Sequence, residues 1–218
     1  MKRNILNASS LALILLALFV ISPVNLNAQL QYGIKVGANF NRTHITGLDA
    51  DLFTENQSNN LSIGIFFNYP FIENTAIQFG AYYVTNTLNL EWTAHSGVVT
   101  PEWKIESLQL PLFLKYAFAP EAKISPYLLG GGYGAYRIKV TETIDGVKDD
   151  AIRYFKPLDF GLVFGAGIDY RLFESLRVTV EARYNLGLTQ VHDVQVNESS
   201  ESYEIKNRSF TLGFGISF

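Results

Sequence analysis

The sequence predicts an all-β protein, an eight-stranded antiparallel up-and-down transmembrane β-barrel that follows a cleaved signal peptide. Three observations carry this prediction: period-two alternation, a regular exchange of long and short connections, and a low content of charge. The alternation is clearest over residues 158–188, where it holds for about thirteen residues on each side of a turn at 172–175. A helix cannot place alternate side chains on one face, whereas a strand does.

The two faces of these stretches differ in chemistry. One carries Leu, Val, Ile, Ala and aromatic residues, and the other carries Gly, Asn, Thr and charges of both signs. Strands of this length exceed the usual five or six residues and suit a tilted strand that crosses a bilayer. A membrane barrel is apolar outside and polar within, whereas a soluble lipocalin-like barrel, the alternative fold, lines its interior with the apolar face. We interpret the polar face as a lumen.

Composition favours the membrane interpretation. Charged residues make up 17% of the 218 residues, against about a quarter in ordinary soluble domains, and the chain has sixteen Phe and twelve Tyr. No stretch reaches eighteen apolar residues, so a membrane crossing must use strands. The chain contains no cysteine, which excludes a disulfide framework and thiolate chemistry.

The first 28 residues are typical of a secretory signal. Lys2 and Arg3 form the basic region, residues 11–21 the apolar core, and Ala28 is the expected last residue before cleavage. We therefore divide the chain into a signal peptide, 1–28, and a barrel domain, 29–218. The mature chain has 15 basic and 20 acidic residues, since the signal removes two of the 17 basic residues and none of the 20 acidic ones. This charge argues against a nucleic-acid partner.

Alternation marks eight strands, at residues 32–41, 61–69, 77–88, 105–118, 126–140, 158–171, 176–189 and 210–218. The connections at 42–60, 89–104, 141–154 and 190–202 are long, and those at 70–74, 119–124 and 172–175 are short. An even number of strands, short periplasmic turns and longer external loops are typical of outer-membrane barrels. We expect a Gram-negative outer membrane, periplasmic termini and extracellular long loops.

Two local features carry further expectations. Pro111 lies within a strand, where proline cannot donate to a ladder, so we expect a β-bulge there. Aromatic residues gather where strands meet the short turns and predict an interfacial girdle. Its expected members are Tyr32, Tyr69, Phe71, Tyr116, Phe118, Tyr127, Tyr170, Phe173 and Phe218.

Several motifs resemble the PorT-like family of outer-membrane β-barrels common in Bacteroidetes. The resemblance spans the mature chain and rests on residues 33–40 (GIKVGANF), 110–116 (LPLFLKY), 126–134 (PYLLGGGYG) and 181–188 (EARYNLGL), with Asn27-Ala28-Gln29 at the signal. It implies an outer-membrane barrel, and an accessory role in protein secretion is one function that it implies. It brings no catalytic motif.

The inward face is expected to carry a charge network. Its predicted members are Lys35, Lys115, Asp159, Asp169, Arg171, Arg177, Glu181 and Arg183, with Arg137 and Lys139 on the same face. An eight-stranded barrel has room inside for side chains, so these charges must pair or be solvated. We expect Glu181 and Asp159 to pair with Arg183, Arg177 and Lys115, which plugs the lumen; a narrow ion or proton path is the alternative.

No catalytic, cofactor or metal site is predicted. His44, His95 and His192 fall in long connections, where an outer-membrane lipid-A-modifying enzyme would place a catalytic histidine, but no nucleophile motif accompanies them. Residues 130–134 are glycine-rich but lack the lysine and helix of a phosphate loop. We expect these glycines to permit curvature or to make room for bulky neighbours.

The sequence therefore predicts a small structural or interaction protein of the cell envelope that is not an enzyme. Its expected partners are outer-membrane lipids and lipopolysaccharide, together with other envelope or secretion proteins. A lipid-A-modifying enzyme, a narrow pore and a soluble lipocalin-like periplasmic binder are the alternatives.

Overall fold

The chain forms a closed antiparallel β-barrel. The computed structural model describes residues 30–46, 53–56, 59–94, 97–99, 102–144, 146–190 and 204–218. The expected signal peptide, residues 1–28, lies outside these ranges. Among the described residues, no helix has the length and apolar character needed to cross a membrane.

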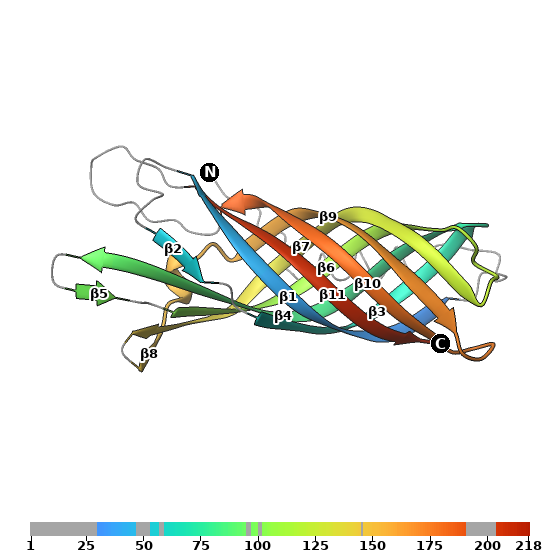
Figure 1. Ribbon diagram of the computed structural model, residues 1–218, viewed down its shortest axis with the longest axis horizontal. Coiled ribbons are helices and arrows are strands. Elements are labelled where there is room, and N and C mark those ends of the chain that lie inside the picture. The colour runs from blue at the N-terminus through green and yellow to red at the C-terminus, as the bar shows by residue number, and fades with distance from the viewer. Residues whose placement is uncertain are drawn as a thin grey trace, which may run out of the picture.

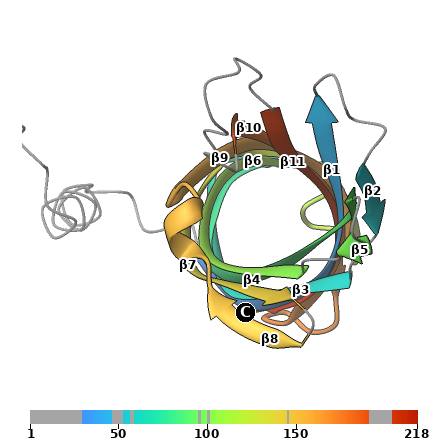
Figure 2. The same ribbon diagram turned by 90° about the vertical axis from the view of Figure 1, so that its left-hand side faces the viewer.

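Eight long strands build the barrel wall, and three short strands extend it. The wall consists of β1 (Gln31–Thr46), β3 (Asn59–Ile72), β4 (Thr75–Ala94), β6 (Glu102–Ala117), β7 (Ile124–Ile144), β9 (Leu158–Arg171), β10 (Arg177–Gln190) and β11 (Glu204–Ser217). The short strands are β2 (Phe53–Asn56), β5 (Gly97–Val99) and β8 (Val147–Asp150), and η2 (Ile152–Tyr154) is a single 3-10 turn. Figure 2 shows the resulting ring from one end.

Every wall strand pairs with two neighbours. The order is β3-β1-β11-β10-β9-β7-β6-β4, and pairing between β3 and β4 completes the circle. The first and last strands close the wall antiparallel from Gly33–Ser217 to Thr46–Glu204, and Tyr32 and Phe218 exchange backbone hydrogen bonds of 3.1 and 2.8 Å. The predicted strand count and up-and-down order are confirmed.

The apolar face points outward, as predicted. On β6 the outward residues from Leu108 to Tyr116 are all exposed, and Leu112 is 61% exposed. Ten residues of a strand tilted by about 40° rise roughly 25 Å, which is the height of the lipid-facing band of outer-membrane barrels. The lipocalin-like alternative is wrong, since it requires these residues to line the interior.

The strands extend much further past the apolar band at one end of the barrel than at the other. The short-turn end carries the connections at 73–74, 118–123 and 172–176, together with the chain's last residue (Figure 1). At the opposite, long-loop end, β4, β6 and β7 run beyond the apolar band and pair with one another, while β2 and β5 add to β4, and β8 adds to β7. Much of the expected long connections at 42–60, 89–104 and 141–154 is therefore strand, because backbone pairing continues past the apolar residues.

The expected bulge at Pro111 is wrong. In the ladder between β6 and β4, the pairs on either side of Pro111, Phe79–Leu112 and Tyr82–Gln109, keep the same register. The missing proline N–H therefore interrupts the pairing, but no extra residue is inserted in either strand. The bulge lies against β7 instead, between Glu106–Lys139 and Ser107–Arg137. The extra residue in β7 reverses the alternation there, and Lys139, expected inside, is exposed.

The expected aromatic girdle is confirmed at seven positions, where Tyr32, Phe71, Tyr116, Phe118, Tyr170, Phe173 and Phe218 are exposed. Tyr69 is half-buried. The prediction for Tyr127 is wrong, because its place in β7 turns the side chain into the lumen, where it is 1% exposed.

Candidate functional site

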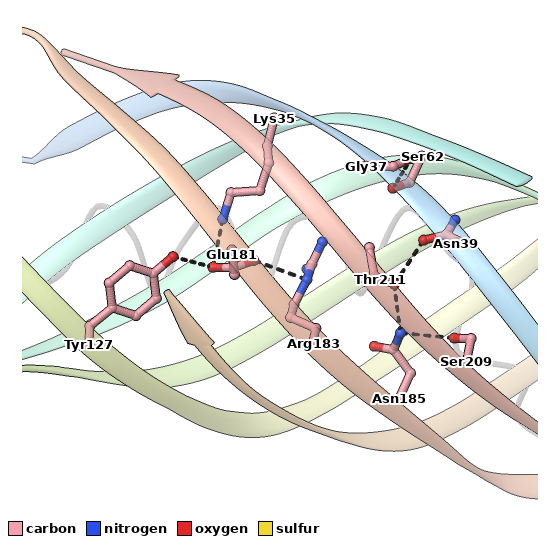
Figure 3. Close-up of polar contacts among 10 residues, drawn as sticks. All are labelled: Lys35, Gly37, Asn39, Ser62, Tyr127, Glu181, Arg183, Asn185, Ser209 and Thr211. Carbon is pink, nitrogen blue, oxygen red and sulfur yellow. Dashed lines mark hydrogen bonds and ion pairs between the residues drawn. The ribbon is translucent and has the colours of Figure 1, made fainter. Parts of the chain in front are cut away.

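The middle of the lumen holds a buried ionic cluster centred on the Glu181 carboxylate. Lys35 Nζ lies 2.9 Å from Glu181 Oε2, Arg183 Nε lies 3.0 Å from Oε1, and the Tyr127 hydroxyl donates to Oε2 at 2.6 Å (Figure 3). Lys35 and Glu181 are only 2% and 1% exposed. Two cationic groups and one hydroxyl thus surround a single buried carboxylate, which offsets part of its desolvation.

Glycines on the neighbouring strands make this cluster possible. In the β-ladders, Glu181 lies opposite Gly167 of β9 on one side and Gly213 of β11 on the other. A Cβ at residue 167 would overlap the Tyr127 phenol, and one at 213 would lie 3.6 Å from Lys35 Cδ. Because Gly167 has no side chain, Tyr127 of β7 can reach over β9 to Glu181, whereas at Gly213 a Cβ would make only an ordinary contact with Lys35.

Arg183 extends the cluster across the lumen. Its guanidinium carbon lies 5.4 Å from the Tyr82 ring centroid and 5.9 Å from the Phe113 ring centroid. These rings come from β6 and β4, which are three and four strands away from β10 around the barrel. Lys35 Nζ similarly lies 4.6 Å from the Phe66 centroid. Cations and aromatic faces therefore fill the cross-section at this level.

A second cluster lies closer to the short-turn end. Lys115 Nζ is 2.6 Å from Asp169 Oδ2, and the Thr179 hydroxyl donates to Asp169 Oδ1 at 2.6 Å. Lys115 Nζ also lies 3.9 Å from the Tyr127 ring centroid. Tyr127 thus contacts both clusters, one through its hydroxyl and the other through its ring.

Asp159 belongs to a third, separate group. It accepts hydrogen bonds from the Tyr133 hydroxyl at 3.3 Å and from the Thr189 hydroxyl. Arg137, also buried, donates to the Lys156 carbonyl. Tyr133 lies opposite Gly161 in the ladder, and a Cβ there would overlap its ring. Gly161 and Gly167, which lie outside the glycine-rich residues 130–134, thus make room for bulky neighbours, whereas within 130–134 a Cβ at Gly131 would overlap the Leu112 backbone oxygen.

Neutral polar and apolar side chains fill the lumen towards the long-loop end. The Thr211 hydroxyl donates to Asn39 Oδ1 at 2.8 Å, and Asn185 Nδ2 donates to Thr211 Oγ1 at 3.1 Å and to Ser209 Oγ at 2.9 Å (Figure 3). Ile105, Val140, Ala151 and Phe155 form a buried apolar cluster next to η2.

The structure divides the predicted charge network rather than uniting it. Glu181 pairs with Arg183 as expected, but its other cation is Lys35, while Lys115 pairs with Asp169 and Asp159 has no cationic partner within ion-pair distance among the described residues. Arg171 turns towards the short-turn end, where Arg171 Nη2 lies 3.3 Å from Glu121 Oε2. Arg177 lines a cavity at that end.

The uncharged members of these clusters were not predicted as such, and they are Phe66, Tyr82, Phe113, Tyr127, Tyr133, Thr179 and Thr189. The parity of β7 would have identified Tyr127, but apolar residues on both of its faces and the glycines at 130–134 conceal that parity. No group of three or more acidic, histidine or cysteine side chains in the described ranges could hold a metal ion. His95 and His192 lie outside those ranges, and the His44 side chain is not described.

Comparison with known proteins identifies the family to which this barrel belongs. Residues 4–193 match the family described as outer membrane protein beta-barrel domain, and this match covers most of the chain. The chain belongs to this outer-membrane barrel family. No curated protein sequence matches the chain.

Solved outer-membrane barrels share the fold. The outer membrane protein OprG from Pseudomonas aeruginosa superposes with a TM-score of 0.55 at 15% identity, covering 88% of this chain and 97% of OprG. The outer membrane protease OmpT from Escherichia coli gives a TM-score of 0.51 at 11% identity, covering 87% of this chain and 96% of OmpT. At such identities the likeness concerns the fold alone. The protein is therefore a small outer-membrane β-barrel.

Proposed function

We propose that this barrel does not conduct and acts through its surfaces, as a structural or interaction component of the cell envelope. The observation that carries the proposal is the path of Arg183, which pairs with Glu181 at 3.0 Å and approaches the Tyr82 and Phe113 rings of the opposite wall. A channel needs a continuous water-filled path, and an eight-stranded barrel has room only for side chains. The chemistry available to partners then lies outside the lumen.

The projecting sheet at the long-loop end is the surface that we assign to partners. Outward charges on β6 begin at Glu106, which accepts a hydrogen bond of 2.7 Å from the Tyr83 hydroxyl, and continue at Lys104. These groups mark where the apolar band ends, so the sheet beyond them stands in water. In this proposal that end is extracellular, the termini are periplasmic, and the signal peptide is removed during export. Lipopolysaccharide and other envelope proteins are the partners.

The resemblance to the PorT-like family supports one specific form of this proposed function, an accessory role in a secretion apparatus. That version rests on the motifs at residues 33–40, 110–116, 126–134 and 181–188. It requires a protein partner, whereas a purely structural role does not.

Single-channel recording in planar bilayers tests the closed lumen. The wild-type barrel is expected to give no current steps, whereas E181G/R183G, which removes the side chains that cross the lumen, is expected to give them. The lipid-facing variant L112A is the control and should behave as the wild type. A steady wild-type conductance that E181Q alters would show that the barrel is a pore.

Site-specific photo-crosslinking in intact cells tests the assigned surface. A photoreactive residue at Val147 or Lys148 of the exposed strand β8 is expected to give a discrete product with an envelope protein or lipopolysaccharide. The same residue at Leu112 should give lipid products alone. Equal products at both positions, or none at β8, would contradict the assignment.

A further inference from the structure

A cavity opens at the short-turn end of the lumen, beside the second ionic cluster, and Lys115 and Asp169 of that cluster line it. Its volume is about 60 Å³, and its lining includes Asn68, Glu73, Lys115, Asp169 and Arg177. A water molecule needs roughly 10–15 Å³ of such space, so the cavity has room for about five non-hydrogen atoms. This is the size of a single tetrahedral oxyanion.

An arginine pair lies at this end of the lumen, and of the two it is Arg177 that lines the cavity. Arg171 of β9 and Arg177 of β10 are direct partners in the ladder, and both occupy inward positions. Directly opposed like charges destabilise a sheet pair. Only a compensating negative group between or beside the guanidinium groups removes this repulsion.

The protein itself supplies little compensation. Arg171 Nη2 donates to the Pro120 carbonyl at 3.0 Å and lies 3.3 Å from Glu121, whose side chain is 91% exposed. The Arg171 Nε atom is buried without a hydrogen-bond partner. For Arg177, no carboxylate lies within ion-pair distance among the described residues.

The acidic groups of the cavity do not fill this role. The Asp169 carboxylate is already engaged, at 2.6 Å, by both Lys115 and Thr179. Glu73 lies in the exposed turn between β3 and β4. The Arg177 guanidinium therefore has no carboxylate partner beside this space of anionic size, and its neighbour Arg171 is paired only with the exposed Glu121.

Asn68 adds a second unsatisfied group to the same cavity. It is 4% exposed, and its side-chain oxygen has no hydrogen-bond donor. A ligand that carries an O–H or N–H beside its anionic oxygens would satisfy both Asn68 and the arginines. Hydrogen phosphate has this combination, and so does the last residue of a peptide, with its carboxylate and amide N–H.

We propose that this cavity binds a small oxyanion of the size of hydrogen phosphate, held by Arg177 with Arg171 beside it, while Asn68 Oδ1 accepts a hydrogen bond from the anion's O–H group. Guanidinium groups suit such ligands because they can give two parallel charge-assisted hydrogen bonds. The site lies at the end opposite the projecting sheet and is independent of the function proposed above.

Urea unfolding of the full chain in phospholipid vesicles tests the proposal, with inorganic phosphate compared with potassium chloride at equal ionic strength. The urea midpoint of the wild type is expected to rise with phosphate concentration and to saturate, because a ligand of the folded state stabilises it. R177Q is expected to weaken the apparent affinity by about tenfold or more, which is the usual effect of losing a hydrogen bond to a charged group. Without phosphate, R177Q should unfold no earlier than the wild type, since it removes the opposed charge.

K148Q, which removes one exposed positive charge at the far end, is the matched control and should keep the full phosphate response. N-acetylglycine in place of phosphate distinguishes the source of the oxyanion. An Arg177-dependent shift with this compound assigns the site to a peptide carboxylate, and a shift with phosphate alone assigns it to free or esterified phosphate. No shift with either compound, or equal shifts in the wild type and R177Q, would overturn the proposal.

Discussion

Glu181 shows at the level of one residue how far sequence can predict this interior. Alternation along β10 indicates that its side chain points inward, and the same rule applies to Arg183. Its partner Lys35 is 146 positions away in sequence. That pair depends on the register of three strands, and a single strand's pattern does not contain this information. Most inward residues and the Glu181–Arg183 pair within β10 were predictable, whereas the pairing between strands was not.

Replacing Glu181 by glutamine is expected to destabilise the barrel by about 3–5 kcal/mol, since it leaves Lys35 and Arg183 buried without a carboxylate. Urea unfolding in phospholipid vesicles, followed by circular dichroism, measures this as a lower midpoint. E121Q removes a carboxylate whose side chain is 91% exposed and should leave the midpoint nearly unchanged. Similar midpoints for E181Q and the wild type would show that the cluster does not stabilise the fold.

At the level of strands, the sequence predicted the faces better than the ends. Period-two alternation identified all eight wall strands because one face must meet lipid. It did not identify the ends, since backbone pairing in β4, β6 and β7 continues into segments with no apolar face. The bulge beside Lys139 was also beyond prediction, because Pro111 is the stronger local signal and the ladder tolerates it without a shift.

The outward face of β6 predicts that the stability lost on introducing a charge depends steeply on the depth of the residue in the membrane. L112R places a charge near the middle of the apolar band and is expected to cost about 2–4 kcal/mol, whereas L108R, beside Glu106 at the edge of the band, should cost about 0–1 kcal/mol. Urea unfolding of both variants in phospholipid vesicles measures the difference. Equal losses of stability in L112R and L108R would mean that the apolar band is not centred on Leu112.

At the level of the whole molecule, closure joins the first strand to the last. Ile34 and Ile216 are direct partners in the β1–β11 ladder, although 182 positions separate them. Directly opposed residues of antiparallel strands have Cα atoms about 4.5–5.5 Å apart, which suits a disulfide.

Because the chain has no cysteine, I34C/I216C can report closure without interference. Oxidation of the folded barrel is expected to cross-link this pair, seen as a mobility change of the denatured chain on a non-reducing gel. I34C/F164C, with both residues on the lipid face but on strands that are not neighbours, should not cross-link. Cross-linking of the control alone would contradict the strand order.

The meeting of β1 and β11 also has a consequence for folding. Until the last strand arrives, the sheet has two open edges with unpaired backbone groups, and such edges favour aggregation. The final ladder joins residues from opposite ends of the chain, a high contact order of the kind that slows folding. Lys35 then reaches Glu181 only in the last step, so the central ion cluster gains its Lys35–Glu181 pair when the ring closes and not before.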